Sequence, residues 1–141
     1  DYGYEEAEYY RPERNSGTLL AHFKHHAHEN FYLYPGIQDL TANVNFTQVA
    51  EIALNDGLEF MGYTTQNFFL LGNQLTEMLE EAHASIESDI EWFKISKATQ
   101  ELVSPAGMGD RVKVIAFGRE IDHLFEEDLQ GFSLATYEYL L

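Results

Sequence analysis

The chain has 141 residues, of which 45% are hydrophobic, and this length and composition predict one domain with a sizeable core. A formal net charge of −16 repels phosphate backbones, which argues against nucleic acid as the main partner, and the lack of cysteine excludes disulfides and thiolate metal sites. No apolar run approaches the roughly 20 residues that a membrane-spanning helix needs, so no membrane span is expected.

The first four residues have the pattern of a strand end with nothing before it, and the chain opens on Asp1 rather than on methionine. We therefore expect residues 1–141 to be a single domain that is a fragment of a longer protein. A polar loop is predicted over residues 5–17. A strand is predicted over Thr18–His26, leading into residues 27–34, before the turn signal Pro35-Gly36.

Four histidines lie within seven residues of this region: His22, His25, His26 and His28. In one continuous strand His22, His26 and His28 would share a face, and imidazole is a good zinc ligand. The spacing is not that of a known zinc motif, and ligands on alternating faces rarely close a tetrahedron. Histidines that line a binding cleft, or that support its walls by hydrogen bonds, are therefore the favoured interpretation, and no metal site is predicted.

The stretch Pro35–Phe46 is rich in hydrogen-bonding side chains, which lie between two predicted regular elements. Loops held by a rigid scaffold often carry function, so this stretch could be a site. The same side chains could instead only satisfy their own backbone in a well-capped loop, and composition alone favours that alternative. The residues concerned are Gln38, Asp39, Thr41, Asn43 and Asn45.

A helix is predicted to begin after Asn45, which would cap it together with Gln48, and to end at Gly57. A strand is predicted to follow over Leu58–Thr64, and this helix–glycine–strand order is typical of α/β proteins. One face of the helix should be buried, and it consists of Phe46, Val49, Ala50, Ala53 and Leu54.

The second half of the chain predicts two more helices, one from Thr65 or Gln66 to about Ala84 and one capped by Ser88 that runs to about Val103. Val112–Phe117 is nearly all apolar, as expected of a strand covered on both faces. The first of these helices should bury Phe68, Leu71, Leu75, Met78, Leu79 and Ala82. The tail should end in a short packed segment containing Gly131, Phe132, Leu134, Tyr137 and Leu140.

Tyrosines near the start of the chain (Tyr2, Tyr4, Tyr9 and Tyr10) could form a substrate wall or could simply pack on the core. Acidic residues cluster around positions 77–91 and 120–128, where solvated helix faces explain them. The sequence contains no nucleophile elbow, no phosphate-binding glycine loop and no dinucleotide fingerprint.

A series of short motifs nevertheless resembles the C-terminal half of the MidA-like family of S-adenosylmethionine-dependent methyltransferases. The resemblance covers most of residues 1–118 in order. One member of that family is a mitochondrial complex I assembly factor that methylates an arginine of a complex I subunit. The motifs are Asp1-Tyr2-Gly3-Tyr4, Glu8-Tyr9-Tyr10, Pro12, Arg14, Gly17-Thr18-Leu19, His25, His28, residues 35–42, residues 62–66, residues 69–71, Pro105, Met108-Gly109 and Lys113-Val114.

The resemblance implies an α/β fold: the C-terminal half of a class I, Rossmann-like methyltransferase sheet with helical insertions. Asp1-Tyr2-Gly3 would end the fourth parallel strand, and Thr18–His26 would be the fifth. Residues 58–64 and 112–117 would form a closing antiparallel pair. The glycine-rich loop and the acidic residue that hold the cofactor would precede Asp1, so this chain alone should bind S-adenosylmethionine poorly.

The resemblance also implies a site, because ligands of open α/β sheets lie at the carboxyl ends of the strands. Asp39 and Asn43 would be catalytic, since an acceptor guanidinium must be positioned and its charge held. The cofactor would contact Asp1, Tyr2 and Gly3. The substrate would contact Tyr2, Tyr4, His25, His28, Gln38 and Thr41.

Two positions depart from the family pattern, in which Thr-Ala-His-Val-Asp-Phe is usual. Here the histidine is replaced by Asn43, which cannot act as a base, and the aspartate by Asn45, which still caps a helix well. The expected function is therefore methyl transfer to a protein, at arginine, with a respiratory-complex subunit as one candidate partner. The alternative is a non-catalytic binding or assembly module. A bacterial cytoplasm or a mitochondrial matrix fits both.

Overall fold

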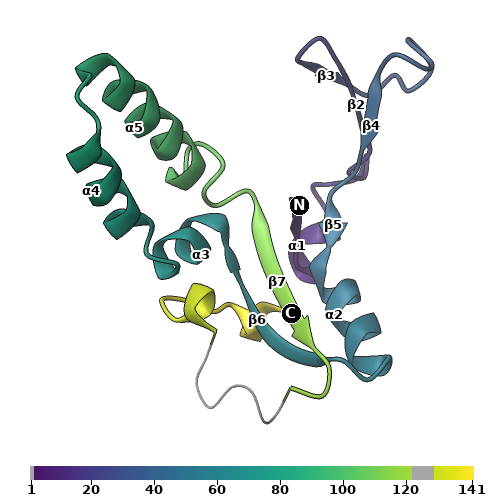
Figure 1. Cartoon of the computed structure of the whole chain (residues 1–141). Helices are drawn as coiled ribbons and strands as arrows, with labels where there is room; N and C mark the ends of the chain where they lie inside the picture. Colours follow the sequence, from purple (N-terminus) through teal and green to yellow (C-terminus); the bar gives the residue numbers. More distant parts are fainter. Residues whose placement is uncertain (1, 122–128) are drawn as a thin grey trace.

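The protein is described here by a computed structural model that covers residues 2–121 and 129–141. It is a mixed α/β fold with three small sheets (Figure 1). In chain order its elements are β1 (Gly3–Tyr4), α1 (Glu6–Tyr9), β2 (Leu20–Phe23), β3 (His26–His28), β4 (Asp39–Thr41), β5 (Val44–Asn45), α2 (Phe46–Asn55), β6 (Glu59–Thr65), α3 (Gln66–Gly72), α4 (Leu75–Ser85), α5 (Asp89–Val103), β7 (Lys113–Gly118), η1 (Gln130–Phe132) and η2 (Glu138–Leu140).

Two small sheets form the body of the molecule. Strand β1 pairs in parallel with β5, and β6 pairs antiparallel with β7, as the resemblance implied for residues 58–64 and 112–117. An isolated antiparallel bridge between Tyr2 and Val112 joins the two sheets. The expectation that the last strand is covered on both faces is wrong, because every residue of β7 is only half-buried.

The predicted fifth parallel strand, Thr18–His26, is wrong. The chain reverses at Lys24 and His25, whose φ values of 47° and 66° are those of a two-residue hairpin turn of type I′. Strand β2 therefore pairs antiparallel with β3 on one side and with β4 on the other. In Figure 1 this three-stranded sheet projects away from the body, above β5 and α2.

Turn and cap signals around α2 are confirmed. Asn45 accepts a hydrogen bond from the Gln48 backbone N–H at 3.1 Å. Gly57 ends the helix with φ at 78°, and the backbone N–H groups of Gly57 and Leu58 donate to the carbonyls of Leu54 and Ala53, as in a Schellman motif. The Pro35-Gly36 turn is also present, with the Ile37 N–H donating to the Tyr34 carbonyl.

The buried face of α2 differs from the predicted one. Phe46, Ala50 and Ala53 are buried, but Thr47 joins them while Val49 and Leu54 are exposed. The helix turns its Thr47 side inward because the Thr47 hydroxyl accepts a hydrogen bond from the Glu6 backbone N–H at 2.9 Å. That bond attaches α2 to the start of α1.

The helix predicted from residue 65 to 84 is two helices. Gln74 has a left-handed φ of 63°, which ends α3 and starts α4 in a new direction. Gly72 packs directly against the backbone of Gln130, so α3 stays on the body while α4 leaves it. None of the six residues predicted as a buried stripe is buried, and Met78 is 62% exposed. Helix α5 begins after Ser88 and ends at Val103, as predicted.

The core lies around β6 and the C-terminal segment. Tyr63 and Thr64 are fully buried, and Phe132 packs on Gly62, where any side chain would overlap the phenyl ring. The Tyr137 backbone N–H donates to the Tyr63 carbonyl at 2.8 Å. The packed terminal segment is thus confirmed for Phe132, but Leu134 and Leu140 are exposed.

Candidate functional site

A side-chain contact brings together the start of β1 and the end of β4. The hydroxyl of Tyr2 lies 2.7 Å from Oγ1 of Thr41, in hydrogen-bond contact. Strands β1 and β5 approach so closely that a Cβ on Gly3 would overlap the Val44 carbonyl. The half-buried Asn43 lies in the short link between β4 and β5. Four of the predicted site residues thus gather at one end of β1.

Tyr4 already faces a guanidinium. The Cζ atom of Arg14 lies 3.8 Å from the centre of the Tyr4 ring, and its Nη2 lies 2.9 Å from the Glu8 carboxylate. The Arg14 side chain is only 11% exposed. One face of the ring predicted to hold a substrate cation therefore carries the chain's own cation, while the role of Tyr4 in substrate binding stays a prediction.

One face of the three-stranded sheet carries a group of polar side chains. Asp39 lies directly opposite His22 in the β2–β4 pair, and Thr41 lies opposite Leu20 two residues further along. Directly opposite residues share a face, so His22, Asp39 and Thr41 are on the same side of the sheet. His22 was not among the predicted site residues. The spacing of Asp39 and Thr41 could have pointed to it only if the hairpin at Lys24 had been predicted.

His25 and His28 lie elsewhere. His25 is in the exposed hairpin turn. His28 is on the other face of the sheet, edge-on to the Tyr34 ring at 6.3 Å, and both of its ring nitrogens are buried without a hydrogen-bond partner. The predicted common face of His22, His26 and His28 is wrong, because the reversal pairs His22 with Ala27. Within residues 2–121 and 129–141 no three ligating side chains gather as a metal site.

Gln38 closes the loop that precedes β4. Its side-chain amide donates to the Phe31 carbonyl, and its Oε1 is buried without a partner. Asp39 itself is exposed. The predicted site residues of this sheet are therefore divided between its two faces, with the predicted catalytic Asp39 and the predicted substrate contact Thr41 on the face that reaches Tyr2.

Two carboxylates near β1 have partners in the protein itself. Glu5 accepts a hydrogen bond from the Tyr63 hydroxyl at 2.7 Å, and Glu8 binds both Arg11 and Arg14. Burial, and then the hydrogen bond and charge of Glu5, raise the pKa of the Tyr63 hydroxyl well above its ordinary value. Neither carboxylate is free to hold a cofactor ribose. Asp1, predicted as a cofactor contact, lies outside the described residues, as do positions 122–128 of the second acidic cluster.

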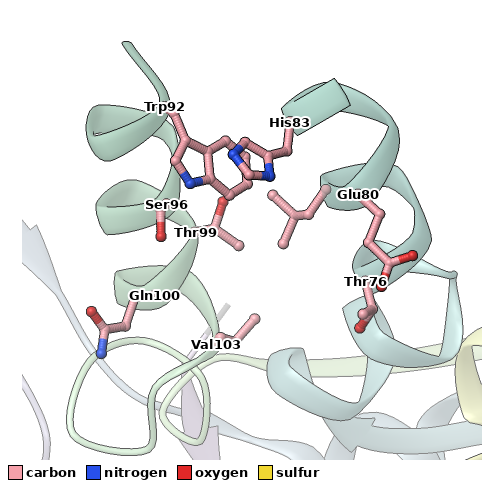
Figure 2. Close-up of a pocket in the computed structure, with 9 residues that line it drawn as sticks. Thr76, Glu80, His83, Trp92, Ser96, Thr99, Gln100 and Val103 are labelled. Atoms are coloured by element: carbon pink, nitrogen blue, oxygen red, sulfur yellow. The ribbon is translucent and has the colours of Figure 1, made fainter. Parts of the chain in front are cut away.

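A second candidate site lies between α4 and α5, which Figure 2 shows in close-up. It is a groove of about 500 Å³. The rings of His83 on α4 and Trp92 on α5 stack across it, with centroids 4.2 Å apart. Its lining is Thr76, Leu79, Glu80, His83, Trp92, Ser96, Thr99, Gln100 and Val103. Sequence reasoning missed this groove because it assigned Leu79 to a buried stripe.

Comparisons with known proteins found one match to the first 64 residues and others to the whole chain. The family described as "Putative S-adenosyl-L-methionine-dependent methyltransferase" matches residues 1–64. A native crystal structure of a COG1565 superfamily protein from Burkholderia thailandensis is 39% identical, with a TM-score of 0.88 over 100% of this chain. A second structure, of a COG1565 superfamily member from the same organism bound to S-adenosyl-homocysteine, gives the same identity and TM-score. The comparison with curated proteins found no match.

This chain spans 36% of the length of the first of these solved relatives and 35% of the second. In the described residues no helix is long and apolar enough to cross a bilayer. Residues 1–64 thus match a family of putative S-adenosyl-L-methionine-dependent methyltransferases, and the whole chain is similar in sequence and fold to COG1565 superfamily proteins, as the resemblance predicted.

Proposed function

We propose that this chain is the C-terminal part of an S-adenosylmethionine-dependent methyltransferase that acts on a protein, at arginine. The observation that carries the proposal is the 39% identity, over the whole chain, to a structure bound to S-adenosyl-homocysteine. The proposed setting is a bacterial cytoplasm or a mitochondrial matrix. A respiratory-complex subunit is one candidate substrate.

The proposed acceptor site is the polar face that runs from Tyr2 to Asp39. S-adenosylmethionine supplies an electrophilic methyl group, and a guanidinium nitrogen must lose a proton as it gains that group. Asp39 would hold the guanidinium charge, and His22 opposite it would accept the proton. His22 would then be the base, a role that Asn43 cannot fill. The Tyr2–Thr41 hydrogen bond would fix the wall beside them.

The cofactor itself would be held mainly by residues outside this stretch. Gly3 and Tyr2 could form a wall at the end of β1, but Glu5 and Glu8 are engaged with Tyr63, Arg11 and Arg14. The 141-residue chain alone is therefore expected not to bind S-adenosyl-homocysteine at 100 µM ligand, as measured by calorimetry. Micromolar binding to this chain would overturn the assignment of the cofactor half to another segment.

The catalytic role is tested in the full-length gene product with the change Asp39→Ala. Methyl transfer to arginine, measured by mass spectrometry on extract from cells that lack the protein, should fall by about 100-fold, the usual size of the loss when one group that stabilises charge in the transition state is removed. Glu29→Ala is the matched control, because Glu29 is an exposed acid of the same sheet region. Unchanged turnover in Asp39→Ala would remove Asp39 from the site.

A second candidate function is a non-catalytic assembly module. The loop that connects β3 and β4 exposes apolar side chains, with Tyr32 at 88% and Ile37 at 67% exposure, as a protein-binding surface would. Together with Asn43 in place of the usual histidine, this favours partner binding without chemistry. A stable complex of the full-length protein with a partner that gains no methyl group would support the module over the enzyme.

A further inference from the structure

The helical hairpin formed by α4 and α5 has no packed interior of its own. All residues of both helices are described, and none of them is buried. The hairpin contacts α3, and the end of α5 also contacts residues 107–109, while the rest of the hairpin extends away from the molecule (Figure 1). Helices of this length are stabilised mainly by packing of an apolar face, so an open apolar face between two helices indicates a missing occupant.

The open face has an apolar floor and a polar rim. Leu79, Trp92 and Val103 are half-buried residues that line the groove. Figure 2 shows Glu80 and Thr76 on the α4 side and Ser96 and Gln100 on the α5 side. The volume of about 500 Å³ suits several large apolar side chains rather than one small ion.

The charge around the groove selects one class of occupant. Residues 75–103 contain seven acidic residues and two basic ones, and Glu80 lies in the groove itself. An acidic or neutral segment would gain nothing from this field, whereas a basic segment would be attracted to it. We propose that the α4–α5 groove binds a basic amphipathic helix of a partner protein.

The geometry fits such a helix. Helices α4 and α5 have 11 and 15 residues, so the groove is long enough for about three turns of a ligand helix. Leucine-like side chains spaced at i, i+3 or i+4 and i+7 would enter between Leu79, Trp92 and Val103, while lysines or arginines would face Glu80. The proposal does not rest on methyl transfer, because binding is measured without cofactor.

The experiment uses Trp92, which is the only tryptophan of the chain. The probe is a 16-residue helical peptide of leucine and lysine with leucines at those spacings. Trp92 emission should shift to the blue and saturate as the peptide is added. A peptide with glutamate in place of lysine, and one with the same composition in scrambled order, should produce no saturable shift.

Two matched pairs of variants locate the binding surface. Glu80→Lys should weaken peptide binding about tenfold, whereas Glu77→Lys changes the net charge equally on the same helix, outside the groove lining, and should weaken it less than about threefold. Leu79→Ser should weaken it, while Met78→Ser, at an exposed neighbour, should not. Circular dichroism confirms that each variant is folded.

Several outcomes would overturn the proposal. Equal binding of the acidic peptide would show that charge does not select the occupant, and equal effects of Glu80→Lys and Glu77→Lys would place the peptide elsewhere. If the longer gene product fails to bind the peptide that the 141-residue chain binds, the groove is filled by the protein's own chain. If the basic peptide binds but no methyl transfer is detected, this proposal stands and the proposed function fails.

Discussion

The body of the molecule has a buried core, whereas the projecting three-stranded sheet has almost none. The body buries Phe46, Tyr63, Thr64 and Phe132 where α2, β6 and η1 meet. In the projecting sheet and its loops, residues 20–41, the only buried residue is Ala21. The sheet owes its form to strand pairing and to turn geometry, not to a core of its own.

This difference indicates that the body provides most of the stability, while the projecting sheet carries the residues proposed for chemistry. A region with few buried apolar groups can place the half-buried His22 opposite the exposed Asp39, but it adds little to the free energy of unfolding. The body must supply that free energy. Substitutions in the two regions should therefore differ mainly in their effect on stability.

The largest effect is expected in the body. Phe132→Ala removes a buried ring that packs on Gly62 and lies edge-on to Phe69 at 5.5 Å, and should lower the free energy of unfolding by about 4 kcal/mol. Urea denaturation measures this. Leu134→Ala, at a residue that is 57% exposed, is the control and should cost less than about 0.5 kcal/mol. Similar costs for both would contradict the assigned core.

Tyr63→Phe should cost about 2 kcal/mol at neutral pH, because it removes a buried hydrogen bond to a carboxylate. The pKa of Tyr63 is raised by folding, so its stabilising effect is complete below pH ~10 and is lost as pH rises further, when the unfolded chain releases the proton that the folded chain keeps. The urea midpoint should therefore fall less between pH 8 and pH 11 in Tyr63→Phe than in the unmodified chain. Parallel profiles would exclude the Tyr63–Glu5 bond as the cause.

In the projecting sheet, His25→Gly should stabilise the fold by about 1 kcal/mol, because glycine adopts a φ of 66° without the steric cost that histidine bears. Thermal unfolding measures the change. His26→Gly, one residue further along within β3, is the control and should destabilise. A loss of stability in His25→Gly would argue against the type I′ turn.

The smallest effect is expected at the tip of the loop between β3 and β4. Ile37→Ser should change the free energy of unfolding by less than about 0.5 kcal/mol, since that side chain is mostly exposed. If this surface binds a partner, the same change should weaken the complex instead. A large loss of stability would mean that the Ile37 side chain packs against another segment of the protein.

Local signals allowed the ends of α2 and α5 to be predicted. Asn45, Gly57 and Ser88 mark helix ends with residue types whose side chains or backbone conformations are specific to those positions. The strands β6 and β7 were predicted from local patterns, whereas their antiparallel pairing was predicted only from the resemblance to a family. The break at Gln74 could not be predicted, because glutamine carries no preference for the left-handed backbone that tertiary packing imposes there.

The candidate site was harder to predict, because one turn, at Lys24 and His25, determines which residues share a face of the sheet with His22. Lys24 and His25 are not the asparagine and glycine that type I′ turns prefer, so the reversal has no sequence signal. If residues 18–26 are assumed to form one straight strand, His22 and His26 share a face, and the pairing of His22 with Asp39 is missed. Tyr2 and Thr41 are in contact, and only the resemblance to a family had placed both in one site.

The hydrogen bond from the Tyr137 backbone N–H to the Tyr63 carbonyl affects what happens to shortened copies of this chain in the cell. The C-terminal segment covers the side of β6 that β7 does not pair with, together with the ring of Phe132. A product terminated early, before Gln130, would expose an open strand edge beside uncovered aromatic rings. Such edges recruit further copies of the same chain, so we expect truncated products to aggregate rather than to persist as partly active monomers.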